Sequence, residues 1–302
     1  MDSGLTLVLL PLALGIIMLG LGLGLTVDDF RRVLAYPKAV LIALACQVLL
    51  LPLVCFGLVV AFDLDPLLAV GMMLLAASPG GTTANLYSHL FGGDVALNVT
   101  LTAINSILAV FTLPVIVNLS LAHFVADSDG VGLQFSKVVQ VFAIVLIPVA
   151  LGMLIRRRAP ELAERLHRPV KLLSVIVLVA VIAGAILKER ENLADYLGSV
   201  GLICALFSLI SLGIGFGVPW LFRVDRRQAI ASSMEIGIHN STLAITIALS
   251  PALLDSTEIA IPAAVYGIVM FFTAAAVGYL ISRGTVNQPV AAGEARPERT
   301  AT

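Results

Sequence analysis

Residues 67–91 read LLAVGMMLLAASPGGTTANLYSHLF, and this stretch decides what kind of fold the chain can adopt. It contains no Asp, Glu, Lys or Arg, and it is long enough to cross a bilayer, which needs about 20 apolar residues. Ser78, Pro79, Gly80 and Gly81 lie near its middle. Because proline removes a backbone donor and glycine weakens a helix, the stretch predicts a membrane span that is not one continuous helix.

The whole chain has the composition that this stretch suggests. Of its 302 residues, 59% are hydrophobic and 12% are charged, and the mean hydropathy is +1.05. These values exclude a soluble globular domain and a disordered chain, and the net charge of −1 gives no nucleic-acid footprint. We predict an all-α polytopic membrane protein with nine transmembrane helices, at 5–25, 39–62, 67–91, 95–121, 134–155, 170–187, 197–222, 229–250 and 259–281.

The basic residues predict an orientation. If the N-terminus is outside, 15 of the 18 Lys and Arg residues fall in cytoplasmic loops or the C-terminal tail, as the positive-inside rule requires. The first span lacks a positive n-region, so we expect a retained helix rather than a signal peptide. Residues 284–302 are polar, and we expect a disordered cytoplasmic tail. These patterns predict a multi-pass protein of the cell (inner) membrane.

A second span repeats the interruption. Residues 229–249 read AIASSMEIGIHNSTLAITIAL, in which Gly237 and the polar residues that follow it break the helical pattern. This span lies five spans after the first interrupted one, so the two cross the membrane in opposite directions. Paired interruptions in opposed halves indicate a transporter binding site. A simple kink, or a tight loop between two re-entrant pieces, is the alternative.

Polar side chains near the breaks suggest a cation. Glu235 is the one carboxylate deep inside a predicted span, and no Lys or Arg lies mid-span to pair with it. A bound cation would stabilise this charge, and a protonated, hydrogen-bonded Glu is the alternative. Asn98, Thr102 and Asn105 share one helix face. Spacing leaves open whether Asn98 and Thr102 are ligands or make interhelical hydrogen bonds, and it favours the hydrogen bonds for Asn105.

Helix ends near the breaks suggest an anionic substrate. The second halves of the two interrupted spans are expected to begin at Thr82 and Thr83 and at Asn240 and Ser241. Helix N-termini carry partial positive charge and favour carboxylate or sulfate groups. We therefore predict these four residues as substrate-binding, with an organic anion as the substrate.

Three motifs resemble the bile acid:sodium symporter family. They are SPGGTTAN at 78–85, GDVALN at 93–98 and EIGIHN at 235–240, and the resemblance covers roughly 5 to 281. It implies two inverted five-helix repeats with two broken crossing helices, here in a nine-helix form that lacks the first helix. It also implies panel helices at 1–62 and 166–224, and core helices at 63–165, with a broken helix at 67–91, and at 225–283, with a broken helix at 229–250.

The resemblance implies sodium as the cation, with one or two ions and no organic cofactor. For the first site, Asn85, Thr102 and Glu235 match the family pattern, while Ala84 and Asn98 stand where hydroxyl residues are usual. Ala84 has only a carbonyl to offer, and Asn98 keeps an amide oxygen.

For the second site, the resemblance implies Glu235 again, Gln47 and the carbonyls of Ile236 and Ile238. His239 replaces a usual Gln, and the hypothesis is that it weakens or replaces the second sodium.

The function predicted from these features is sodium-coupled symport of an organic anion, bile-acid-like or another carboxylate, by alternating access. Membrane lipid surrounds such a protein, and a monomer or weak oligomer is expected. A proton-coupled carrier that uses His239 is the alternative. An intramembrane enzyme that uses Glu235 and His239 is a weaker rival, because no nucleophile or metal cluster accompanies them.

Overall fold

The computed structural model describes residues 34–125, 135–166, 193–250 and 253–283, with shorter pieces between 15 and 28 and between 169 and 176. In this part of the chain every element is helical, apart from an isolated bridge between Gly80 and His239. The all-α prediction is confirmed there. The predicted first and sixth spans and the tail at 284–302 lie largely or wholly outside the described residues.

The described helices follow the predicted spans closely. They are α3 (Pro37–Ala45), η2 (Cys46–Leu50), α4 (Leu51–Ala61), α5 (Pro66–Ala77), α6 (Thr82–Leu90), α7 (Val95–Phe124), α8 (Phe135–Arg158), α10 (Leu193–Leu221), α11 (Arg226–Gly237), α12 (Ser241–Leu249) and α13 (Thr257–Ser282). Among the described residues, four helical segments are long and apolar enough to cross a membrane: Pro37–Ala61, Val95–Phe124, Val200–Leu221 and Thr257–Ser282. The two interrupted spans are split into α5 and α6, and into α11 and α12.

The two split spans are built alike. α5 and α11 each have 12 residues, and α6 and α12 each have nine. Asp65 and Asp225 cap the first halves, each accepting a hydrogen bond from the backbone N–H two residues later. A long helix precedes each cap and another follows each second half. The same order of elements therefore occurs twice in the chain.

The turns before the caps repeat too. Asp63 and Arg223 both have positive φ, at 47° and 59°. The next residue donates its N–H to a carbonyl five residues back, from Leu64 to Val59 and from Val224 to Pro219. This bond and the left-handed residue are features of the Schellman motif that ends helices. The repeat thus extends to the hydrogen bonds of individual turns.

Burial separates the first halves of the split spans, α5 and α11, from the long helices. Ten of the 12 residues of α5 are buried, as are nine of the 12 in α11. The long helices carry exposed large side chains, such as Leu53, Leu119 and Phe272. Exposed apolar side chains suit a surface that faces lipid, whereas the enclosed halves have their backbone satisfied by protein.

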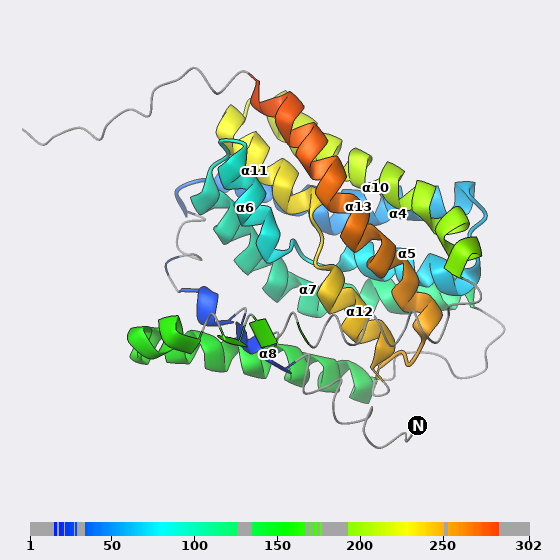
Figure 1. The fold of residues 1–302 in the computed structure, drawn as a ribbon, viewed down its shortest axis with the longest axis horizontal. Coiled ribbons are helices and arrows are strands. Elements are labelled where there is room, and N and C mark those ends of the chain that lie inside the picture. The colour runs from blue at the N-terminus through cyan, green and yellow to red at the C-terminus, as the bar shows by residue number, and fades with distance from the viewer. Residues whose placement is uncertain are drawn as a thin grey trace, which may run out of the picture.

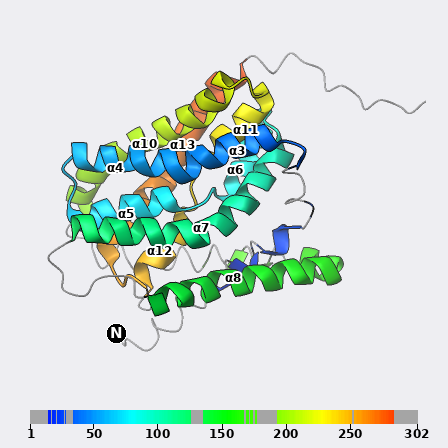
Figure 2. The same ribbon diagram turned by 180° about the vertical axis from the view of Figure 1, so that it is seen from behind.

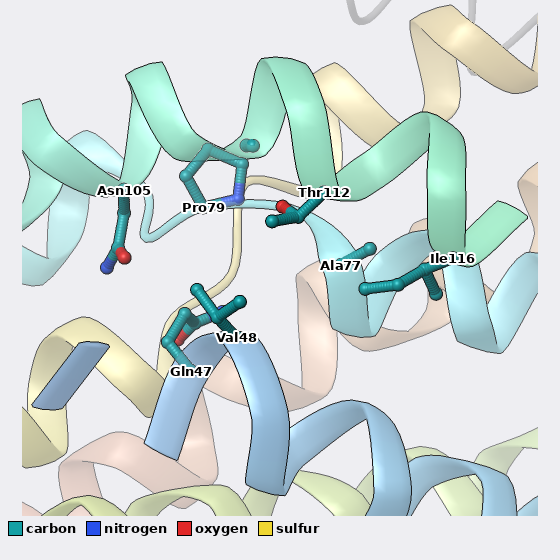
Figure 3. A pocket seen from close by; sticks show the side chains of 8 residues that line it. Gln47, Val48, Ala77, Pro79, Asn105, Thr112 and Ile116 are labelled. Carbon is teal, nitrogen blue, oxygen red and sulfur yellow. The ribbon is translucent and has the colours of Figure 1, made fainter. Parts of the chain in front are cut away.

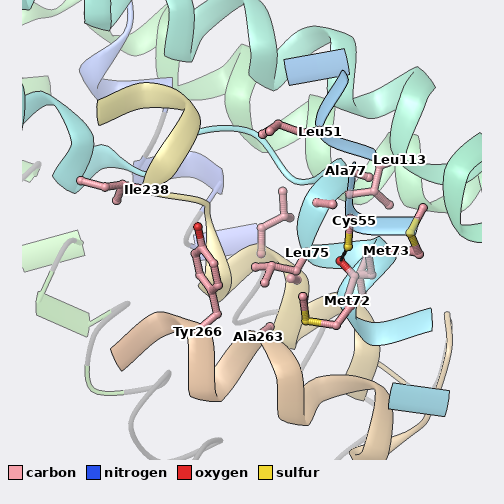
Figure 4. Close-up of a cluster of buried hydrophobic side chains, with 14 of the residues drawn as sticks. Leu51, Cys55, Met72, Met73, Leu75, Ala77, Leu113, Ile238, Ala263 and Tyr266 are labelled. Carbon is pink, nitrogen blue, oxygen red and sulfur yellow. Dashed lines mark hydrogen bonds between the residues drawn. The ribbon is translucent and has the colours of Figure 1, made fainter. Parts of the chain in front are cut away.

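The helices form a bundle around the split spans. α13 crosses the molecule beside α10, α12 and α5, and α7 lies along α5 (Figure 1). From behind, α4 passes in front of α10 and lies next to α5, and α8 runs along one edge of the bundle (Figure 2). Apolar side chains fill the space around α5, including Leu51, Cys55 and Met72, and they meet Tyr266 of α13 (Figure 4).

Candidate functional site

The two helix breaks pair with each other. The N–H of Gly81 donates to the carbonyl of Ile238 at 2.7 Å, and the N–H of Asn240 donates to the carbonyl of Pro79 at 2.8 Å. Gly80 and His239 face each other between these bonds in an antiparallel bridge. Proline disfavours helix in the residue before it, and Ser78 is accordingly extended. Each break thus satisfies backbone groups that the other frees, which allows both to persist inside the protein.

Glu235 lies beside this pairing and is fully buried, in the last turn of α11. The hydroxyl of Thr102 donates to its Oε2 at 2.6 Å, and the amide nitrogen of Asn105 donates to its Oε1 at 3.3 Å. The backbone of Gly80 packs directly on the carboxylate, so that a Cβ added there would overlap it. The ion pair found among the described residues joins Arg156 to Glu164, far along the chain from this carboxylate.

Several buried amide oxygens near the crossover lack a hydrogen-bond partner. Among the described residues, these are Oδ1 of Asn85, Asn98 and Asn105 and Oε1 of Gln47. Asn98 uses its amide nitrogen on the carbonyl of Ala231, at 2.8 Å, and leaves its oxygen free. A buried acceptor without a donor costs free energy. Four such oxygens and a carboxylate suit a hard cation, which prefers oxygen ligands.

Of the residues expected at the first sodium site, all but Ala84 have a side-chain oxygen. Thr102 contacts Glu235 directly, and Asn98 is fully buried one turn earlier on α7. Asn98 also makes an interhelical hydrogen bond, so both interpretations of its spacing fit. Ala84 is fully buried on α6 and has no side-chain oxygen, whereas the neighbouring Asn85 has an unpartnered one.

Asn105 contacts Glu235, although it was not among the residues predicted for the site. It does make the interhelical hydrogen bond that its position suggested, but the partner is Glu235 itself. Its spacing of seven residues from Asn98 was the available signal, because residues seven apart share a helix face. The three polar residues of α7 that were predicted to share a face all bond to α11, Asn98 to the carbonyl of Ala231 and Thr102 and Asn105 to Glu235.

Gln47 reaches the first break from a π-helical turn. η2 spans Cys46–Leu50, and the N–H of Leu51 bonds to the carbonyl of Cys46. Pro52 follows immediately and has no N–H for a regular helical bond to Val48, which explains the wider turn. The amide nitrogen of Gln47 donates to the carbonyl of Ser78 at 3.0 Å.

His239 contributes a ring instead of an amide to the second break. The ring stacks on Phe207 with centroids 5.4 Å apart, and Tyr266 meets it edge-on at the same distance. Its Nδ1 lies 3.4 Å from the carbonyl of Ser78, and its Nε2 has no partner among the described residues. Ile236 and Ile238 are fully buried beside it, and the carbonyl of Ile238 already accepts from Gly81.

The two helix N-termini differ in how they are capped. α6 begins at Thr82, as expected, and no side chain caps it. α12 begins at Ser241, and Asn240 caps it by accepting from the N–H of Leu243 at 3.0 Å. The Asn240 side chain therefore accepts from one of the backbone N–H groups that we predicted would bind an anion. The amides of α6 carry no such side-chain cap.

A pocket lies between η2, the first break and α7. It is small and is lined by Gln47, Val48, Ala77, Pro79, Asn105, Ala109, Thr112 and Ile116. Gln47 and Asn105 approach its same end from opposite helices (Figure 3). The pocket thus places two polar residues of the crossover beside an otherwise largely apolar space.

Comparison with known proteins adds an independent finding. The model of the Sodium Bile acid symporter family matches residues 11–196. A Bacillus subtilis protein named "uncharacterized sodium-dependent transporter YocS" is 30% identical over 255 residues, which cover 84% of this chain and 77% of that protein.

Two further relatives carry cotransporter names. The rice "probable sodium/metabolite cotransporter BASS2, chloroplastic" is 30% identical over 80% of this chain, which spans 56% of the rice protein. The human "ileal sodium/bile acid cotransporter" is 27% identical over 79% of this chain, and the match covers 68% of that protein. These relatives are all described as sodium-dependent transporters or cotransporters.

Proposed function

The chain belongs to the sodium bile acid symporter family, and from that membership we propose that it is a secondary active transporter that couples Na⁺ to the movement of an organic anion. The family is one of sodium-dependent transporters, and its members handle small organic substrates. We propose that Na⁺ binds at the crossover of the two split spans, with Glu235 as the charged ligand.

The observation that carries the proposal is the surroundings of Glu235. The carboxylate is fully buried, and its described neighbours are a hydroxyl, amide groups and freed backbone rather than a basic side chain. Desolvating a carboxylate is costly unless a partner compensates for it. A sodium ion held by Glu235, Thr102 and the unpartnered oxygens of Asn98 and Asn85 would supply that partner.

The residues that match the family pattern support this ligand set. Thr102 and Glu235 are in direct contact, and Asn98 lies on the same helix face as Thr102. A second ion would draw on Glu235, Gln47 and the carbonyls of Ile236 and Ile238, with His239 in place of an amide. The unpartnered oxygen of Gln47 is consistent with such a ligand.

The substrate is proposed to be a carboxylate or sulfate that interacts with the helix N-termini at the breaks. The amides at Thr82 and Thr83 lack a side-chain cap and are the stronger candidates, and Asn240 and Ser241 complete the proposed site. Bile acids are the cargo named for the human relative. A steroid-like or smaller carboxylate is therefore the class to test first.

Coupling follows from the position of the breaks. A cation that orders the paired loops would also fix the helix N-termini next to them, and so raise anion affinity. Linkage requires the anion to raise sodium affinity by the same factor. Movement of the core helices, 63–165 and 225–283, against the panel helices, 1–62 and 166–224, would then expose the site alternately on the two sides.

The experiment is uptake into proteoliposomes of the purified protein. Cholate and a set of small carboxylates are offered under an inward Na⁺ gradient and under a matched K⁺ gradient. Uptake of at least one anion is expected only with Na⁺, and Glu235→Gln should abolish it. Glu258→Gln is the matched control, because Glu258 lies in the first turn of α13, away from the breaks.

Equal uptake under both gradients would contradict sodium coupling. Uptake driven by a pH gradient without Na⁺ would favour the proton-coupled alternative that uses His239. Chemical conversion of an offered lipid or sterol would support the intramembrane enzyme instead.

A further inference from the structure

Three arginines lie where α11 begins and α13 ends, and they are called the arginine patch below. Arg226 and Arg227 are the first two residues of α11, and Arg283 directly follows α13. All three are exposed. These helix ends lie together at one end of the bundle, next to α10 and α6 (Figure 1). The predicted orientation puts this end at the cytoplasmic side of the membrane.

Two of the three side chains are held on the last turn of α13. Arg226 donates from Nη2 to the carbonyl of Ile281 at 2.9 Å. Arg283 donates from Nη2 to the hydroxyl of Tyr279 at 3.1 Å, and its guanidinium lies 4.5 Å from the centre of the Tyr279 ring. A guanidinium has five N–H donors. These contacts therefore fix the two side chains and leave most of their donors for a further acceptor.

The carboxylates near the patch do not neutralise it. Asp225 accepts from the backbone N–H of Arg227, and Asp94 accepts from that of Leu97. Asp94 lies close by, because its own N–H donates to the carbonyl of Arg227. Among the described residues, no ion pair joins either carboxylate to the patch. Arg223 in the preceding turn adds a further positive charge, so this surface is basic.

The repeated cap and turn show that folding does not require these arginines. α5 begins as α11 does, after a residue with positive φ and an Asp cap. Its first two residues are nevertheless Pro66 and Leu67, and its positive-φ residue is Asp63 where the second copy has Arg223. The same turn is therefore acidic in one copy and basic in the other. The basic charge needs a reason other than the shape of the turn.

Exposed apolar side chains lie beside the patch. They are Trp220, Leu221 and Phe222 at the end of α10, and Tyr279 and Leu280 at the end of α13. Trp and Tyr are enriched at membrane–water interfaces, at the level of the lipid headgroups. Positive charge next to such side chains suits a ligand with an anionic head and apolar tails.

We propose that the arginine patch binds the phosphate of an anionic phospholipid, whose acyl chains lie on the exposed apolar side chains of α10 and α13. A planar guanidinium bonds phosphate oxygens in pairs, which favours arginine for this role. A lipid bound here contacts the start of α11, the helix that carries Glu235 in its last turn. The inference goes beyond the proposed function and does not depend on sodium coupling.

The test compares two lipids on the purified protein in detergent. The unfolding temperature is followed as dioleoylphosphatidylglycerol or dioleoylphosphatidylcholine is added, and inorganic phosphate is added in a third series. The wild type should be stabilised by the anionic lipid more than by the zwitterionic one, and not by phosphate. Arg226→Gln combined with Arg283→Gln should raise the phosphatidylglycerol concentration for half the shift about 30-fold, because each arginine near an anionic lipid contributes about fivefold.

A double variant with the same change in charge is the matched control. Arg157→Gln combined with Arg158→Gln removes two exposed arginines from the end of α8 and should keep the wild-type response. Arg227→Gln is a second variant that spares the fold, because the Arg227 side chain makes no hydrogen bond to the described residues. It should weaken the response to phosphatidylglycerol about fivefold.

Several results would overturn the inference. They are an equal response of the wild type to the two lipids, an unchanged response in both patch variants, and an equal loss in the α8 control, which would indicate general charge attraction. Stabilisation by inorganic phosphate as large as that by phosphatidylglycerol would also overturn it, because the patch would then recognise a free anion rather than a lipid.

Discussion

Replacing Gly80 by Ala tests the position of the Glu235 carboxylate most directly. A Cβ at this residue would overlap both oxygens and the carboxyl carbon of Glu235. Gly80 is not in the left-handed region that favours glycine, so the backbone itself tolerates alanine. The predicted damage therefore comes from the collision alone. The carboxylate must move, and it must then give up its hydrogen bonds with Thr102 and Asn105.

The size of the effect follows from those two hydrogen bonds. A bond to a charged group contributes about 1.5–3 kcal/mol, so losing both costs about 3–6 kcal/mol. Gly80→Ala should therefore lower the free energy of unfolding by up to this amount, and it should weaken Na⁺ binding because the carboxylate is displaced from Thr102. The assay is the Na⁺ dependence of the unfolding temperature, with choline as the replacement cation.

Two comparisons make the result interpretable. Gly217→Ala on α10 adds a methyl group with nothing within 4 Å, and it should leave Na⁺ affinity unchanged. In a Glu235→Ala background the collision partner is gone, so Gly80→Ala should cost far less stability than in the wild type. If Gly80→Ala keeps wild-type Na⁺ affinity, the carboxylate is not the centre of the cation site.

The remaining predictions concern the ligand hydroxyl, the repeated caps and the orientation. Thr102→Val should weaken Na⁺ binding about tenfold to a hundredfold, because it removes the 2.6 Å bond to Glu235. Thr100→Val is the control and should not weaken it, because the Thr100 hydroxyl bonds to the Ala96 carbonyl. Equal Na⁺ titrations of the two variants would refute the assignment. Asp65→Ala and Asp225→Ala should each lower stability by about 0.5–2 kcal/mol in thermal unfolding, and no loss in either would contradict the caps. In intact cells, an impermeant thiol reagent should label a cysteine placed at Asp63 but not one at Arg223, and the reverse pattern would invert the proposed orientation.

Much of the fold could be predicted because its signals are local. Pro79 with two glycines after it stops a helix wherever it lies, and α5 does end just before it, at Ala77. The starts of α6 and α12 also fall where the polar residues suggested. Helix ends elsewhere agree within a few residues, because long apolar runs leave little choice in a membrane.

The site was only partly predictable, because it depends on neighbours that are distant in the sequence. Asn105 was assigned a structural hydrogen bond, and nothing in its local sequence indicates that Glu235, 130 residues away, is the partner. The capping role of Asn240 was likewise not anticipated, and it changes which helix N-terminus is free. The π-helical turn that presents Gln47 was also not predicted, because the apolar pattern of the span runs through it without a change.

The sequence by itself determined that the chain is helical, that two spans are interrupted, and that one carboxylate lies deep within an apolar segment. Hydrophobicity, proline and glycine act over a few residues, so these features can be read along the chain. Only the tertiary structure decided that the two breaks hydrogen-bond to each other, and that Thr102, Asn105 and Gly80 surround Glu235. Backbone groups freed inside a membrane protein must find partners, and which partners they find depends on how distant segments pack.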